Sequence, residues 1–285
     1  MSTNVSAADP WTPTAYNASA AFVPQLTTRV LHLLDPQPTD QILEIGSGNG
    51  QLTAQIATDL LNGRIHGLDS SQNFITSAQT THAGPNITYK LQDCTRLNQN
   101  ADLMSTAGQW DKLFSNATLH WVLRPLATRQ SVFSDFHHLL KPKGLLVFEM
   151  GGAGNVAETH AAFVAALTAQ NVSVEKAREF TPWFFPSEEW MRLTLERAGF
   201  VVEVCEIEYR PTKLMPKGEG GQGGLEGWVR LMGAGFLKAL GEEDESGREA
   251  VVGRVCEVLD GVVTRVEDGS QWLGYVRLRV VARKR

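Results

Sequence analysis

The chain has 285 residues, of which 42% are hydrophobic and 20% are charged, and this is the apolar content of a folded globular protein. Its formal net charge of −5 offers no positive field for nucleic-acid phosphates, so a DNA or RNA partner is not expected. The first ten residues are polar, and no stretch approaches the roughly 18 apolar residues of a membrane span, so we expect a cytoplasmic protein without a membrane partner.

The cysteines and histidines give no sign of a disulfide framework or a metal site. Cys94, Cys205 and Cys256 are far apart and odd in number, so reduced and mostly buried thiols are expected. The histidines lack HExxH or similar spacing, so no bound metal is expected either.

A strand, a glycine loop and a helix open the regular part of the chain. An apolar strand is predicted over 41–45, and it runs into Gly46, Gly48 and Gly50. Apolar residues at helical spacing follow over 52–60, and a second strand over 64–68 ends at Asp69. Because Ser70 or Ser71 can cap the next helix, the order is that of a βαβ unit.

Helices and strands continue to alternate beyond this unit. Strands are predicted over 87–91, 112–115 and 145–150, with a helix over 132–140 and a turn over 141–144 before the third. A capped helix from 186 to Gly199 precedes a strand over 200–209, and a final strand covers 273–282. This alternation predicts an α/β fold with a mostly parallel sheet covered by helices on both faces.

Two segments, 155–185 and 225–260, do not fit the alternation and read as helices of a cap, because the second carries wide apolar helical stripes. Five glycines within 218–224 predict a flexible connection into that cap. The expected organisation is an N-terminal flap and helix (1–30), a cofactor-binding core (31–150), a cap insertion (151–186), a core helix and strand (187–215), a helical cap insertion (216–265) and a final core strand (266–285).

The glycine loop predicts a site for an adenosine-containing cofactor. Glycines at a strand-to-helix turn let the backbone approach a ligand, and Asp69 at the end of the next strand can accept hydrogen bonds from ribose hydroxyls. The third glycine falls two residues after Gly48, whereas in NAD-binding loops it falls three residues after the second glycine. The acidic Glu44 also suits a cofactor with an ammonium and a sulfonium better than a pyrophosphate. We therefore expect S-adenosylmethionine.

Four motifs carry a family resemblance: the loop EIGSGNG, the acid within GLDSSQNF, the pair Asp93-Cys94 and the run SNATLHW. Together they resemble the sequential motifs of class I S-adenosylmethionine-dependent methyltransferases. More narrowly, the spacing of Trp11 and Tyr16 and the ending YVRLRVVAR are similar to trans-aconitate methyltransferases and related small-molecule enzymes. The resemblance covers nearly the whole chain and implies the Rossmann-like fold of that class, with a seven-stranded sheet.

The resemblance also implies roles for individual residues. The glycine loop would hold the methionine part, Asp69 the ribose and Asp93 the adenine amino group, while the Cys94 amide would contact the adenine ring and the Asn116 carbonyl the ammonium. Asp93 as a turn residue and Asn116 as a strand-end cap remain the alternatives. The full expected cofactor set is Glu44, Gly46, Ser47, Gly48, Gly50, Asp69, Ser70, Asp93, Cys94, Asn116, Trp11 and Tyr16. Trp11 and Tyr16 would form an aromatic flap over the cofactor or, alternatively, anchor the terminus.

His120 follows the carboxyl end of a strand, the edge at which open α/β sheets bind ligands. It can act as a general base or only position the substrate, and positioning is favoured because a carboxylate acceptor needs no base. Trp121, Trp183 and Trp228 are the candidate substrate residues, with a role in the core of the cap as the alternative.

One departure bears on the substrate. Related tricarboxylate methyltransferases carry arginine in the helix after the N-terminal aromatics, whereas 18–28 here contains no basic residue, so a less charged or more apolar acceptor is expected. Methyl transfer to oxygen, as a carboxylate or hydroxyl, is the leading function. Transfer to nitrogen or carbon, a cofactor-binding protein with another reaction, and an NAD-dependent oxidoreductase are the alternatives. The acceptor and the oligomeric state are left open.

Overall fold

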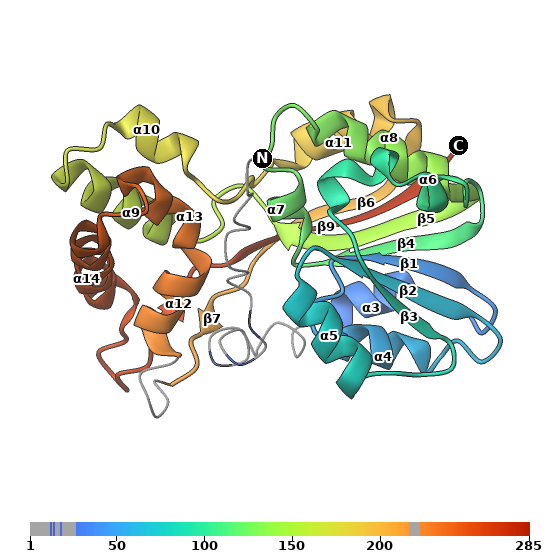
Figure 1. Cartoon of the computed structure of the whole chain (residues 1–285), viewed down its shortest axis with the longest axis horizontal. Coiled ribbons are helices and arrows are strands. Elements are labelled where there is room, and N and C mark those ends of the chain that lie inside the picture. Colours follow the sequence, from blue (N-terminus) through green and yellow to red (C-terminus); the bar gives the residue numbers. More distant parts are fainter. Residues whose placement is uncertain (1–11, 13, 15–17, 19–26, 217–222) are drawn as a thin grey trace, which may run out of the picture.

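The computed structural model describes residues 12, 14, 18, 27–216 and 223–285. Its main element is a seven-stranded sheet in the order β3-β2-β1-β4-β5-β9-β6 (Figure 1). Within this sheet, the described strands are parallel except for β9, which runs antiparallel to its neighbours β5 and β6. The predicted mostly parallel α/β sheet is therefore confirmed. The strands are β1 (Gln41–Ile45), β2 (Arg64–Asp69), β3 (Ile87–Leu91), β4 (Trp110–Asn116), β5 (Leu140–Gly151), β6 (Phe200–Tyr209) and β9 (Val276–Lys284).

Helices cover both faces of this sheet. In Figure 1, α3 (Thr28–Leu34), α4 (Gln51–Ala57) and α5 (Gln72–Thr81) lie on one face, while α6 (Ala101–Met104), α8 (Arg129–Leu139) and α11 (Glu188–Arg197) lie on the other. A large apolar cluster under α8 and α11 includes Phe133, Phe136 and Phe148, all fully buried. Two short helices, η1 (Cys94–Gln99) and α7 (Leu119–Val122), follow β3 and β4.

Serine caps begin two of these helices where the sequence predicts them. The Ser71 hydroxyl accepts a hydrogen bond from the Phe74 N–H at 3.1 Å, and Ser187 accepts one from Trp190 at 3.2 Å. Each cap satisfies an amide that the first helical turn leaves without a partner. The caps therefore fix where α5 and α11 start.

Several strand boundaries differ from those predicted: β4 starts two residues earlier and ends one residue later, and β5 and β9 differ most. The expected turn over 141–144 is an irregularity within β5, because Trp110 pairs with Leu140 while Lys112 pairs with Leu145. The final strand begins at Val276 rather than at 273. Trp272–Leu273 instead forms a short strand, β8, which pairs with β7 (Thr212–Lys213) outside the main sheet.

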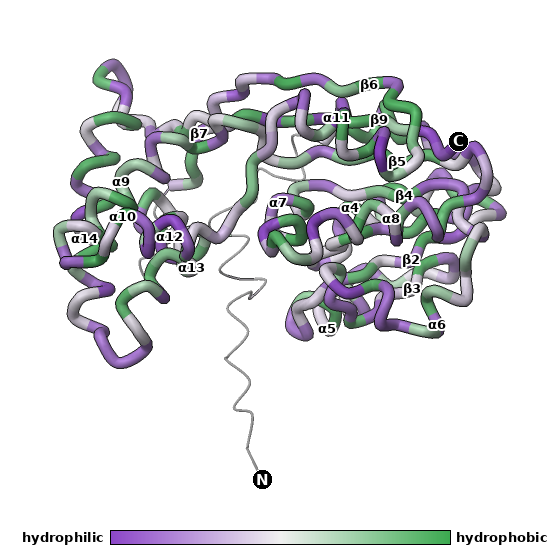
Figure 2. Tube along the Cα trace, turned by 90° about the horizontal axis from the view of Figure 1, so that it is seen from above, coloured by the Kyte–Doolittle hydropathy of each residue, from purple (hydrophilic) through white to green (hydrophobic). Residues whose placement is uncertain are grey.

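The remaining helices form a cap beside the sheet, and Figure 2 shows the two groups of elements from above. The cap contains α9 (Ala157–Ala169), α10 (Val174–Glu179), α12 (Gly224–Met232), α13 (Ala234–Leu237), η3 (Lys238–Leu240) and α14 (Glu245–Val263). Its helices come from two separate segments of the chain but share one apolar cluster. Within it, the rings of Phe163 and Phe236 stack with their centroids 4.6 Å apart.

Three further observations concern the described residues only. No helix among them combines the length and the apolar content needed to cross a membrane. They contain no group of three or more side chains arranged to hold a metal ion. Cys94, Cys205 and Cys256 form no disulfide with one another, and Cys94 is buried.

Candidate active site

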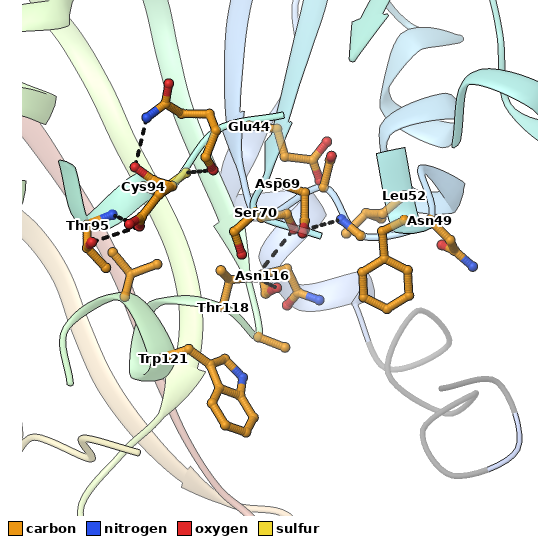
Figure 3. Close-up of a pocket in the computed structure, with 18 residues that line it drawn as sticks. Glu44, Asn49, Leu52, Asp69, Ser70, Cys94, Thr95, Asn116, Thr118 and Trp121 are labelled. Carbon is orange, nitrogen blue, oxygen red and sulfur yellow. Dashed lines mark hydrogen bonds between the residues drawn. The ribbon is translucent and has the colours of Figure 1, made fainter. Parts of the chain in front are cut away.

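A cavity of about 260 Å³ lies at the carboxyl ends of β1, β2 and β4 (Figure 3). In Figure 3, Cys94 and Thr95 lie on one side of Asp69, Asn49 and Leu52 lie on the other, and Trp121 lies further along. The cavity is lined by Glu44, Gly46, Ser47, Gly48, Asn49, Leu52, Asp69, Ser70, Phe74, Gln92, Asp93, Cys94, Thr95, Asn116, Ala117, Thr118, Trp121 and Val122.

The loop between β1 and α4 needs its glycines. Gly46 has φ +78°, and a Cβ built there would lie 2.2 Å from the Thr118 side chain. Gly48 has φ +55°, but a Cβ there would meet nothing within 4 Å, so its backbone is open to a ligand. Gly50 does not line the cavity, because its missing Cβ points at the hydroxyl of Tyr89, 2.5 Å away.

The Asp69 carboxylate is held at the cavity wall by two backbone amides. Its Oδ2 accepts from the Gly48 N–H and its Oδ1 from the Ser71 N–H, both at 2.9 Å. A carboxylate offers about four lone-pair positions, so each oxygen can also accept from a ligand hydroxyl. This arrangement fits a ribose diol.

Glu44 lies in the same wall and is 2% exposed. Its Oε2 accepts from the Thr53 hydroxyl at 2.6 Å. Burial, together with the nearby Asp69 charge, raises the pKa of Glu44 to about 7. Because a cation in the cavity would favour the ionised form of Glu44, this position suits the positively charged parts of S-adenosylmethionine.

Asn116 and Asp93 also line this cavity. Among the described residues, the buried Oδ1 of Asn116 has no hydrogen-bond partner, whereas its backbone carbonyl accepts from the Thr118 hydroxyl at 3.1 Å. The side-chain oxygen is therefore the acceptor that fits an ammonium. Asp93 accepts from the Thr95 N–H at 2.9 Å and caps η1, so it is also the turn residue of the alternative interpretation. Burial raises the pKa of the Cys94 thiol, which keeps that side chain neutral.

A second, smaller cavity of about 50 Å³ adjoins the first and shares Ala117 and Trp121 with it. Its walls come from α7, from the cap and from the start of β9. They comprise Ala117, His120, Trp121, Asn155, Val156, Trp183, Phe185, Trp228, Met232, Tyr275 and Arg277. Ala117 and Val156 have positive φ angles of 54° and 44°, which are uncommon for residues with a Cβ and occur often at binding sites.

His120 in this second cavity is a neutral hydrogen-bond donor. The Gly151 N–H donates to its Nδ1 at 3.3 Å, so the ring proton resides on Nε2. Burial, together with the nearby positive charge of Arg277, lowers the pKa of His120 to about 3. The ring is therefore suited to position an acceptor and poorly suited to take a proton from it.

The structure brings most of the predicted site residues together. Nine of the expected cofactor residues line the first cavity and Gly50 does not; Trp11 and Tyr16 lie outside the described residues. Trp121, Trp183 and Trp228 all line the second cavity beside His120.

Sequence reasoning gave no site role to Arg277 and Tyr275, which it read only as alternating residues of the final strand. The sequence did carry a signal for Arg277: it lies between apolar residues of the final strand, and a charge buried there needs a partner.

Comparisons with known proteins agree with this geometry. The family described as "Methyltransferase domain" matches residues 43–146. An uncharacterized methyltransferase of Schizosaccharomyces pombe is 30% identical over 278 residues, covering 97% of this chain and 98% of the relative. A trans-aconitate 2-methyltransferase of Shigella dysenteriae is 25% identical, with 96% and 98% covered.

Solved structures share the fold. The crystal structure of a Bacillus halodurans protein superposes with a TM-score of 0.59 at 15% identity, covering 91% of this chain and 99% of the other. The sheet order, the glycine loop and the full-length relative lead to one conclusion: the chain belongs to the class I methyltransferases, enzymes whose methyl donor is S-adenosylmethionine.

Proposed function

We propose that the enzyme methylates a small organic molecule at an oxygen atom, within the second cavity. The observation that carries this proposal is the shared wall, because Ala117 and Trp121 border both cavities and so bring a bound acceptor next to the cofactor. An amine acceptor is disfavoured, because the charge of Arg277 would repel an ammonium and His120 would not deprotonate it.

The residues of the first cavity fit the cofactor. We assign Asp69 to the ribose, Glu44 and the Asn116 side chain to the cationic end, and the Gly48 backbone to the methionine part. When bound, S-adenosylmethionine supplies an electrophilic methyl group on a positively charged sulfur. The protein contributes by holding the acceptor in line with that group and by excluding water, effects worth up to roughly 7–11 kcal/mol.

The relatives support a small acceptor. The Shigella dysenteriae relative carries trans-aconitate in its name, and the heteroatoms of that molecule are all carboxylate oxygens. For this enzyme we propose a small acceptor rather than a nucleic acid, and a cytoplasmic location, both from the sequence.

Calorimetry and a product screen test the proposal. The purified protein should bind S-adenosylmethionine and S-adenosylhomocysteine but not NAD. Asp69→Ala should weaken cofactor binding by about 10- to 100-fold, because it removes charged hydrogen-bond acceptors. Asp59→Ala, which removes an exposed carboxylate away from the cavity, is the matched control and should bind normally.

The screen incubates the enzyme with methyl-labelled cofactor and an extract of small metabolites. A labelled small product is expected. Tight binding of NAD would exclude the cofactor assignment, and cofactor binding without any labelled product would exclude methyl transfer.

A further inference from the structure

We infer that the second cavity accepts a compact monocarboxylate, that Arg277 binds its carboxylate, and that the product is a methyl ester. This inference rests on the proposed function and narrows it to one class of acceptor. It depends on three features of the cavity: its aromatic walls, the single cation that lines it and the neutral donor beside that cation.

Aromatic rings form most of the cavity wall. Trp183 stacks on Phe185 with centroids 5.5 Å apart, and its ring also lies 5.9 Å from that of Trp121 and 6.3 Å from that of Trp228. Such a surface favours an apolar or aromatic body in the acceptor. The cavity volume of about 50 Å³ holds only a small group, so the acceptor must be compact, and a ring-sized body must also reach the wall that Ala117 and Trp121 share with the first cavity.

Arg277 is the one cationic side chain among the described residues that line this cavity. It is 4% exposed, lies over the Tyr275 ring and approaches Glu149 at 3.8 Å through Nε. Glu149 is held more closely by Arg210 at 2.8 Å and by Arg279 at 2.6 Å. Arg279 is itself paired with Glu206 and Glu208, and Arg277 keeps Glu149 as an ion-pair partner. The Arg277 guanidinium also lines the cavity, where it is placed to bind a second carboxylate.

Neutral donors stand beside this cation. His120 presents a neutral ring because its pKa is about 3. The Tyr275 hydroxyl accepts from the Trp228 indole N–H at 2.8 Å, and burial raises its pKa, so this hydroxyl is neutral. One guanidinium with neutral donors matches one carboxylate, whereas a tricarboxylate would bring two further charges into an aromatic pocket without cationic partners.

The reaction balances without a proton transfer. An oxygen of the bound carboxylate forms a bond to the methyl carbon while the carbon–sulfur bond breaks, and the bonding pair remains on sulfur. The acceptor changes from a carboxylate anion to a neutral ester, and the sulfonium becomes a neutral thioether. An acceptor ionised at neutral pH needs no general base, and none of the described residues that line the cavity is suited to act as one.

The first test uses defined acceptors and a chemical signature of the product. Benzoate, phenylacetate and hexanoate are compared with trans-aconitate, phenol and benzylamine, each with methyl-labelled cofactor. Mild alkaline hydrolysis releases labelled methanol from esters but not from ethers or amines. We expect alkali-labile product from the monocarboxylates at kcat/KM at least tenfold above trans-aconitate. Alkali-stable product, or a preference for trans-aconitate, would overturn the inference while leaving methyl transfer itself intact.

The second test measures binding rather than turnover. Calorimetry of the S-adenosylhomocysteine complex should show that benzoate binds at least tenfold more tightly than benzamide, its neutral isostere. Arg277→Gln should weaken benzoate binding by about 10- to 100-fold and bring the acid-to-amide ratio near one. Arg279→Gln removes an equally buried arginine that does not line the cavity, so it should lower thermal stability and keep the ratio.

If Arg277→Gln does not fold, as loss of cofactor binding would show, the wild-type comparison decides alone. Equal affinity of the wild-type protein for benzoate and benzamide contradicts the role of Arg277. Failure of the protein to bind or use the cofactor contradicts the proposed function instead, so the two failures are distinguishable.

Discussion

Glu44 links cofactor binding to pH. Because its pKa in the protein is about 7, it is increasingly protonated below that pH, while a bound cation favours its ionised form. Affinity for S-adenosylmethionine should therefore rise as the pH increases from 6 to 7.5, by up to about tenfold per pH unit for one coupled proton. Calorimetric titrations with S-adenosylmethionine across this pH range measure the change in affinity. Glu44→Gln should bind more weakly and lose the slope, and an unchanged slope in that variant would assign the titration to another group.

His120 gives a second prediction, on turnover. With its pKa near 3, the ring stays neutral through the physiological range, so its loss should not remove an acidic limb from the pH profile. His120→Gln retains a hydrogen-bond donor and should keep kcat within about tenfold, with a raised KM, whereas loss of a general base costs about 10²- to 10⁴-fold. Steady-state kinetics over pH separates the two. A thousandfold fall in the kcat of His120→Gln would instead support a general-base role for His120.

At the scale of elements, Gly253 and Gly46 give a matched pair of substitutions, because there is room for a Cβ at Gly253 but not at Gly46. Gly253 is exposed in the middle of α14 and a Cβ there would meet nothing within 4 Å, so Gly253→Ala should stabilise the protein by about 0.4–1 kcal/mol. Gly46→Ala should destabilise it and impair cofactor binding, because its Cβ would collide with Thr118. Thermal unfolding with and without cofactor measures both changes. Equal effects of the two substitutions would contradict the role given to the loop.

The sequence predicted some elements closely and missed others for physical reasons. β1, β3 and β6 have the predicted bounds, because apolar or alternating residues there are flanked by turn residues. β7, β8 and α7 contain only two to four residues each, too few to show a periodicity. Gln92 in a loop and Thr95 in η1 reach the cavity through tertiary placement, which local pattern does not encode.

At the scale of the whole molecule, the two cavities differ in how far sequence could predict them. The first is built by consecutive strand ends, so its motifs appear in chain order. The second combines His120 of the core, Trp228 of the cap and Arg277 of β9. Because the cap folds from two distant segments, the identity of its aromatic residues was predictable but the pairing with Arg277 was not.

The position of β9 has a consequence for how the protein is made. This strand inserts between β5 and β6, and its Arg279 meets Glu149 across a separation of 130 residues. A chain emerging from the ribosome therefore has a gap in its sheet until β9 has been synthesised, and closing such distant pairs is slow. Until then β5 and β6 keep open edges, a hazard for aggregation that chaperones would have to cover. The nascent chain can thus acquire its cofactor loop early, yet it gains an acceptor pocket only when translation has passed β9.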